Sequence, residues 1–177
     1  MRFTPTDLPG VMLVESDPHT DERGFFARTF CRQEFTANGL CGDFAQCSLS
    51  RTTCRETIRG LHFQAAPHEE HKLVRCVRGR IFDVVVDLRP DSPTHRRWLG
   101  VELGETSQQA LYVPPGVAHG FQTLADDVDV LYQISAYYVP GSARGVRWDD
   151  SAFGIRWPFP HRPTLSDRDR NHPDYTT

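Results

Sequence analysis

The sequence predicts an all-β protein built from two packed sheets, as in a sandwich or a barrel. Short β-branched or aromatic runs recur along the 177 residues, and Gly, Pro, Asp and Ser separate them. Hydrophobic residues make up 38% and charged residues 24% of the chain, which is typical of globular proteins and unlike disordered or membrane proteins. The length favours one domain, residues 1–177.

The strand pattern continues along most of the chain. Arg78-Gly79 between two apolar runs predicts a tight hairpin. Val113-Pro-Pro-Gly116 predicts a rigid turn, because proline fixes φ and cannot donate to a strand ladder. The predicted strands are Val11–Glu15, Gly24–Phe30, Phe44–Ser50, Thr57–Gln64, Lys72–Val77, Arg80–Leu88, Trp98–Leu103, Ala110–Val113, His119–Leu124 and Asp129–Ser135.

Helical signals are weak. Arg32–Asn38 followed by Gly39 predicts a short helix, since glycine often ends helices, and a short turn is expected near the C-terminus. The tail from Trp157 is rich in proline and charge, which is typical of a loose terminus. Trp148 and Trp157 favour a packed tail instead, because large aromatic side chains need packing partners.

Composition and charge exclude several classes of function. The net charge of -3 provides no general attraction for nucleic acid, and no apolar run approaches the ~20 residues that cross a bilayer. Met1–Gly10 lacks the features of a signal peptide, so we expect a cytoplasmic protein without a membrane partner. The five cysteines form no CxxC pair, which predicts reduced thiols rather than disulfides or a thiolate zinc site.

Arg59 and His62 would lie on opposite faces of a regular strand. Gly60 between them could form a bulge that brings both side chains to one concave surface. The alternative is a hairpin edge with two solvated polar residues. Lys72 shares a strand face with apolar residues, either as an exposed strand-end cation or as a stabiliser of developing negative charge.

Other polar residues leave alternatives open. His68 and His71, with Glu69 and Glu70, could bind a metal, but the segment resembles a polar loop with solvated side chains. His119 could be a histidine of the hydrophobic core or a residue of the functional site. The tyrosines of residues 130–138 are packing elements or proton donors, and Asp83 and Asp87 are expected to be satisfied structural groups.

Taken together, seven segments resemble the dTDP-4-dehydrorhamnose 3,5-epimerase family. Their order and spacing match from about Pro9 to Asp169, and this joint agreement is more specific than any single motif. The segments are Asp21–Phe26, Arg59–Gln64, Lys72–Arg75, Asp83–Arg89, Ser92–Thr94, Ala118–Phe121 and Leu165–Asp169.

The resemblance implies a cupin-type double-sheet jelly roll with short peripheral helices. It implies a homodimer, a nucleotide-sugar substrate inside the barrel, and neither metal nor other cofactor. His62 would be the catalytic base, Asp169 the carboxylate that orients it, and Tyr132 the acid. Tyr138 would stack on the substrate, and the other positions implied to contact ligand are Arg23, Arg59, Lys72 and His119.

These residue types suit epimerisation beside a ketone. Such a C–H bond becomes acidic only if the enolate oxygen is stabilised, which Lys72 could do with help from Arg59 or His119. His62 could remove the proton from one face, and Tyr132 could return a proton to the other. Asp169 would fix the tautomer of His62.

The sequence departs from the family pattern at the periphery of the expected site. The residues expected to contact the substrate there are Arg28, Gln46, Ser48, Arg144 and Arg168. Arg28 and Arg144 replace glutamates, Arg168 replaces a lysine, and Gln46-Cys-Ser48 replaces Gln-Asp-Asn. Recognition of the base or sugar could therefore differ, and CDP- or GDP-linked sugars or inversion at a single carbon remain alternatives. The other hypotheses are a metal-dependent cupin enzyme, with His62, His68, His71 or His119 as ligands, and a non-catalytic sugar-nucleotide binding module.

Overall fold

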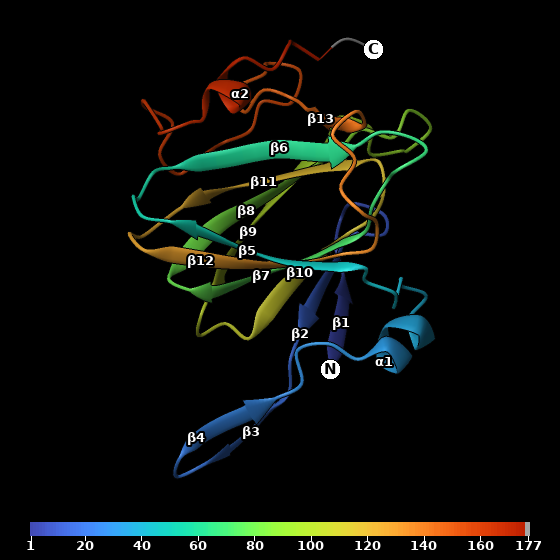
Figure 1. Ribbon diagram of the computed structural model, residues 1–177, viewed down its shortest axis with the longest axis vertical. Coiled ribbons are helices and arrows are strands. Elements are labelled where there is room, and N and C mark those ends of the chain that lie inside the picture. Colours follow the sequence, from blue (N-terminus) through green and yellow to red (C-terminus); the bar gives the residue numbers. More distant parts are fainter. Residues whose placement is uncertain (176–177) are drawn as a thin grey trace.

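Two antiparallel sheets face each other in a computed structural model that describes residues 1–175 (Figure 1). This is the predicted double-sheet jelly roll. Across the first sheet lie β1 (Arg2–Pro5), β2 (Met12–Glu15), β10 (Gln109–Val113), β7 (Lys72–Arg78), β12 (Val128–Ile134) and β5 (Gln46–Thr52). Across the second lie β13 (Ala143–Gly145), β6 (Ile58–Gln64), β11 (Val117–Thr123), β8 (Arg80–Asp87) and β9 (Trp98–Gly104).

The main core fills the space between the sheets. Val74 and Cys76 of β7 and Val130 of β12 meet Val85 of β8 and Phe121 of β11, and all five are buried. Alternate residues on these strands face inward, as the period of two along a strand requires. The same facing surfaces carry the polar residues of the site described below.

The predicted hairpin at Arg78-Gly79 is wrong. Gly79 has a φ of +74° and allows a sharp reversal, but β7 and β8 lie in different sheets. The turn crosses from one sheet to the other, because each strand buries its apolar residues against the opposite sheet rather than pairing with its neighbour in sequence. The turn at Val113–Gly116 makes the same kind of crossing, from β10 to β11.

The remaining differences concern short elements. The predicted strand Gly24–Phe30 is shorter, β4 (Gly24–Ala27), and pairs only with β3 (Pro18–Asp21) in a separate hairpin. This hairpin extends away from the two sheets (Figure 1). Strands β1, β3 and β13 were not predicted, because segments of three or four residues without a buried position carry little alternation. The predicted helix is α1 (Arg32–Ala37).

The C-terminal tail is packed rather than loose. Its residues Trp157 and Leu165 join Ile58 and Val84 in a second cluster on the outer face of the five-stranded sheet. Trp157 donates a hydrogen bond to the Trp148 carbonyl at 2.8 Å. The short helix α2 (Asp167–Arg170) follows and lies over β6 (Figure 1).

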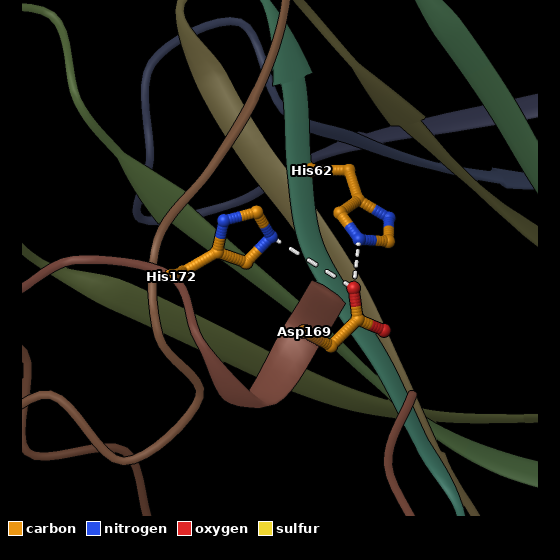
Figure 2. A group of neighbouring side chains, drawn as sticks. All are labelled: His62, Asp169 and His172. Atoms are coloured by element: carbon orange, nitrogen blue, oxygen red, sulfur yellow. Dashed lines mark hydrogen bonds and ion pairs between the residues drawn. The ribbon is translucent and has the colours of Figure 1, made fainter. Parts of the chain in front are cut away.

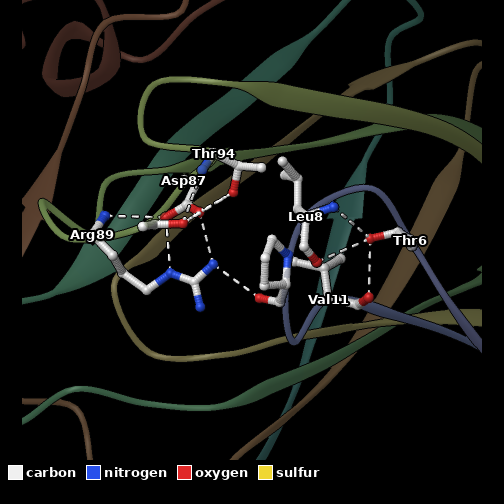
Figure 3. A network of polar contacts seen from close by, with 8 residues as sticks. Thr6, Leu8, Val11, Asp87, Arg89 and Thr94 are labelled. Carbon is white, nitrogen blue, oxygen red and sulfur yellow. Dashed lines mark hydrogen bonds and ion pairs between the residues drawn. The ribbon is translucent and has the colours of Figure 1, made fainter.

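Asp87 at the end of β8 joins two loops to the sheet (Figure 3). Its buried carboxylate accepts hydrogen bonds from the Arg89 guanidinium at 2.7 and 2.8 Å and from Thr94 at 2.6 Å. Arg89 also donates to the Pro9 carbonyl at 2.9 Å. Asp87 is therefore the satisfied structural group that the sequence predicted.

The five cysteines are free, as predicted. Within residues 1–175, no helix is long and apolar enough to span a membrane. The predicted domain of residues 1–177 ends in Thr176 and Thr177, which lie outside the described residues.

Candidate active site

A cavity of about 600 Å³ opens between the two sheets beneath the C-terminal tail. Side chains from both sheets and from α2 line it, so the fold brings together residues that are far apart in the sequence. The predicted site residues that line the cavity are His62, Tyr132, Asp169, Gln46, Ser48, Arg59, Lys72, His119, Tyr138, Arg144 and Arg168.

A bulge in β6 brings Arg59 and His62 to the same cavity. His62 pairs with His119 of β11, while Arg59 pairs with Phe121, so β6 contains one more residue than β11 between these pairs. Gly60 lies in the bulge with a φ of +137°, and a Cβ there would come within 2.5 Å of the Gly120 backbone. The bulge hypothesis is therefore confirmed, with glycine required by the close approach of β11.

His62 forms a short hydrogen bond with the tail (Figure 2). Its Nε2 lies 2.6 Å from Oδ1 of Asp169, whose side chain is 6% exposed. Burial favours the neutral carboxyl group, but hydrogen bonds from His62, the Gly60 amide and Ser166 hold the pKa of Asp169 below its usual range. Because an ionised carboxylate only accepts hydrogen bonds, Nε2 carries the hydrogen, and the neutral form of the His62 ring has its free lone pair on Nδ1.

Lys72 is a buried cation, so the alternative of an exposed strand-end lysine is wrong. Its Nζ lies 3.0 Å from Oε1 of Glu70 and donates to the His62 carbonyl at 3.0 Å. Burial lowers the pKa of Lys72, and the negative charges of Glu70 and Asp83 oppose this shift. An ammonium has three N–H donors, so these two contacts leave one for a ligand in the cavity.

Glu70 was expected to be solvated in a polar loop, and this expectation is wrong. It is 7% exposed, because its carboxylate turns inward to the Lys72 ammonium. The two-residue spacing from Lys72 was the available signal, since residues i and i+2 point to the same side of an extended chain.

His119 belongs to both the core and the site. Its Nε2 lies 2.8 Å from Oδ1 of Asp83, both residues are buried, and His119 also lines the cavity. Asp83 was predicted to be a structural carboxylate with its hydrogen bonds satisfied. In the described part of the chain, only Oδ1 has a hydrogen-bond partner, and that partner is the site residue His119. A carboxylate within the apolar run of β8 needs a buried hydrogen-bond or ion-pair partner, but the sequence did not indicate which residue this partner is.

Tyr132 lies on the sheet opposite His62. It projects from β12 into the cavity, and its ring packs nearly perpendicular to the His119 ring at a centroid distance of 5.9 Å. Burial and the negative charge of Asp83 raise the pKa of Tyr132 above its ordinary value. The phenol therefore keeps its proton at neutral pH and is available as a donor.

Several predicted residues lie at the cavity rim. Gln46 accepts a hydrogen bond from the Tyr138 amide at 2.9 Å, which anchors the loop carrying this exposed tyrosine. Arg59 donates to Thr52 at 2.9 Å. Arg144 of β13 donates to the carbonyls of Gly141 and Ala143, and Arg168 of α2 also lines the cavity. The rim thus carries cations where a diphosphate could bind.

Arg23 and Arg28 lie outside this cavity. Arg23 is on the protruding β3–β4 hairpin, where its exposed side chain pairs with Asp21 (Figure 1). Arg28 pairs with Glu34 of α1 at 3.3 Å. A single chain therefore does not bring these two arginines to the other predicted site residues.

The histidines of the metal hypothesis do not form a common site. Nδ1 of His71 lies 2.6 Å from the Tyr112 hydroxyl, His68 is exposed, and His119 pairs with Asp83. Among the described residues, the one group of three side chains arranged for a metal is His62, Asp169 and His172. His172 was not among the residues predicted from the sequence.

Comparison with known proteins agrees with this geometry. The profile of the family described as dTDP-4-dehydrorhamnose 3,5-epimerase matches residues 5–177. The dTDP-4-dehydrorhamnose 3,5-epimerase of Shigella flexneri is 40% identical over 172 residues, covering 97% of this chain and 94% of that protein. The chain belongs to this epimerase family.

Solved epimerase structures share the fold over nearly the whole chain. The Bacillus anthracis dTDP-4-dehydrorhamnose 3,5-epimerase, with TDP and PPi bound, has a TM-score of 0.95 and 38% identity, covering 98% of this chain and 99% of that one. The Legionella pneumophila epimerase in complex with dTDP-4-keto-L-rhamnose has a TM-score of 0.89 and 33% identity, covering 95% and 89%. The predicted family, cupin-type fold and isomerase class are confirmed.

Proposed function

We propose that this chain inverts C3 and C5 of a dTDP-linked 4-keto-6-deoxyhexose, converting dTDP-4-dehydro-6-deoxyglucose to dTDP-4-dehydrorhamnose. The observation that carries the mechanism is the placement of His62 and Tyr132 on opposite sheets across one cavity. Inversion of a carbon needs a base on one face and an acid on the other, and this cavity offers both.

His62 acts as the base through Nδ1. It removes the proton from the carbon beside the ketone, and the electron pair of the C–H bond moves to form an enolate. The remaining N–H of Lys72 stabilises the enolate oxygen, assisted by Arg59 or His119. Asp169 then balances the positive charge of the His62 imidazolium at 2.6 Å.

Tyr132 completes the inversion. Its hydroxyl gives a proton to the opposite face of the carbon, the ketone re-forms, and the phenolate regains a proton from solvent while His62 releases one. Every proton is accounted for, and no electrons leave the substrate. The same cycle at the second carbon gives the double epimer.

The rim cations suit the nucleotide diphosphate. Arg59, Arg144 and Arg168 border the cavity and provide charge for two phosphates, while Tyr138 offers a ring for stacking. Ser48 and Gln46 contribute polar groups from β5. The bound TDP and dTDP-sugar of the related structures support dTDP over CDP or GDP.

A homodimer would complete the site. The β3–β4 hairpin exposes Phe25 (59%) and Phe26 (76%), and it carries Arg23 away from the cavity of its own chain. Exposed aromatic side chains on a projecting hairpin are suited to contact a second subunit. We propose that Arg23 and Arg28 reach the partner's cavity, in a cytoplasmic enzyme whose single domain spans residues 1–177.

Proton NMR in deuterated water tests the proposal. With dTDP-4-keto-6-deoxyglucose, the signals at C3 and C5 should both disappear as deuterium enters, and chelator should not slow this exchange. The His62→Asn variant should lose exchange, whereas His68→Asn, which changes an exposed histidine outside the cavity, should retain it.

The possible outcomes separate the alternatives. Exchange at one carbon would indicate a mono-epimerase, and loss of exchange in chelator would indicate a metal-dependent cupin enzyme. If dTDP-, CDP- and GDP-linked sugars bind but none exchanges, the chain is a binding module and the proposed chemistry is refuted.

A further inference from the structure

A second histidine lies beside the His62–Asp169 pair without a hydrogen bond. The side chain of His172 is 11% exposed, and its Nε2 is buried and unpaired within residues 1–175. This nitrogen lies 3.8 Å from Oδ1 of Asp169, the same oxygen that bonds to His62 (Figure 2). A buried polar atom without a partner is unfavourable, so its placement requires an explanation.

The fold holds the His172 ring at this position. His172 follows α2 closely, and its ring packs against Gly145 of β13, where a Cβ would overlap the ring. Gly145 in turn pairs with His62 across β13 and β6. The centroids of the His62 and His172 rings are 6.0 Å apart.

Two imidazoles and one carboxylate form a common ligand set for Zn²⁺ and similar divalent ions. One ligand atom from each of His62, Asp169 and His172 lies within 4.8 Å of the others. Bond lengths of about 2.0–2.1 Å in a tetrahedral site place ligand atoms roughly 3.3 Å apart. The two Asp169 contacts would have to change by about 0.5–0.7 Å, and the two histidine nitrogens, which lie within 4.8 Å of each other, would have to approach to the same spacing.

The three side chains offer ligand types that divalent ions bind. Imidazole binds a metal through a ring nitrogen and carboxylate through an oxygen, and both His62 and Asp169 line the cavity. The cavity provides access for a fourth ligand, such as water.

We propose that His62, Asp169 and His172 form an inhibitory site for a divalent transition-metal ion such as Zn²⁺. The ion replaces the hydrogen between His62 Nε2 and Asp169, and the neutral His62 ring then carries its hydrogen on Nδ1. Because Nδ1 is the atom that accepts the substrate proton, a metal-bound enzyme has no base. The metal site rests on geometry, and only its inhibitory effect rests on the proposed function.

Cobalt binding tests the site without turnover. The full-length protein, freed of metal by chelator, is titrated with Co²⁺ while visible d–d absorption is recorded. We expect one ion per chain with nitrogen and oxygen ligands, and at least about tenfold weaker binding to His172→Phe, which fills the same space without a ligand. Gly145→Ala, which displaces the ring, should weaken binding similarly. His68→Asn is the matched histidine control and should bind normally.

Three binding results would overturn the site: no stoichiometric Co²⁺ binding, equal affinity in His172→Phe, or the ultraviolet charge-transfer band of thiolate ligands. The inhibitory effect is measured separately by exchange in the presence of Zn²⁺. Zn²⁺ should inhibit the wild type reversibly with chelator, and His172→Phe should turn over and resist the same concentration. If Zn²⁺ inhibits both proteins equally, inhibition through metal binding at His62 is refuted. If the protein shows no epimerase activity, the result of the cobalt titration is unaffected.

Discussion

Replacing Lys72 by methionine separates its structural role from its proposed catalytic role. The 3.0 Å contact between Lys72 Nζ and Glu70 Oε1 corresponds to about 5.5 kcal/mol of attraction at an effective dielectric constant of about 20. The cost of burying both charges offsets most of this attraction, so the pair adds little net stability. Lys72→Met, however, leaves the Glu70 carboxylate buried without its cation.

We expect Lys72→Met to lose about 3–5 kcal/mol in the free energy of unfolding, the usual cost of an uncompensated buried charge. For a domain of this size, the melting temperature should fall by roughly 6–20 °C. The exchange rate at C3 and C5 should also fall on the order of 100- to 1,000-fold, because the enolate oxygen loses its charged donor.

The double variant Lys72→Met/Glu70→Gln is the matched control. It removes both charges, so it should regain most of the lost stability while exchange stays low. Urea unfolding measures the first quantity, and NMR in deuterated water with saturating substrate measures the second. Recovery of exchange in the double variant would refute enolate stabilisation by Lys72, and wild-type stability of Lys72→Met would refute the buried pair.

Three further predictions use other parts of the molecule. Tyr132→Phe should reduce completed inversion more than deuterium exchange, because deprotonation by His62 continues; equal losses would mean that the ring mainly positions substrate. Mixed dimers of inactive Arg23→Ala and His62→Ala subunits should regain activity, since one of their two sites is intact, and no rescue after subunit exchange would contradict an Arg23 contribution from the partner. Burial favours the neutral carboxyl group of Asp87, but its hydrogen bonds hold the pKa below the ordinary 3.8. The ionised carboxylate therefore stabilises the folded protein above pH 3.8, and this contribution to the free energy of unfolding declines as the pH falls below 3.8. Asp87→Asn should cost about 3 kcal/mol in urea unfolding at pH 7 and less below pH 4, whereas a pH-independent difference would exclude this linkage.

The strand pattern located most of the two sheets, because inward-facing residues alternate with a period of two. The predicted strands Lys72–Val77 and Arg80–Leu88 correspond closely to β7 and β8. Their pairing was wrong, because Gly79 permits a reversal within one sheet and a crossing between sheets equally well. Burial of both apolar faces, rather than turn chemistry, selected the crossing.

The sequence by itself determined the fold class and the family resemblance, and it indicated Gly60 as a place where β6 could bulge. The tertiary structure decided which side chains act together. The family resemblance implied that Asp169 meets His62 across 107 residues, but only the folded chain shows that Asp83 reaches His119 across 36 residues and that His172 lies beside the first pair. These contacts depend on how the sheets pack and where the tail lies, and local hydrophobic periodicity carries no information about either.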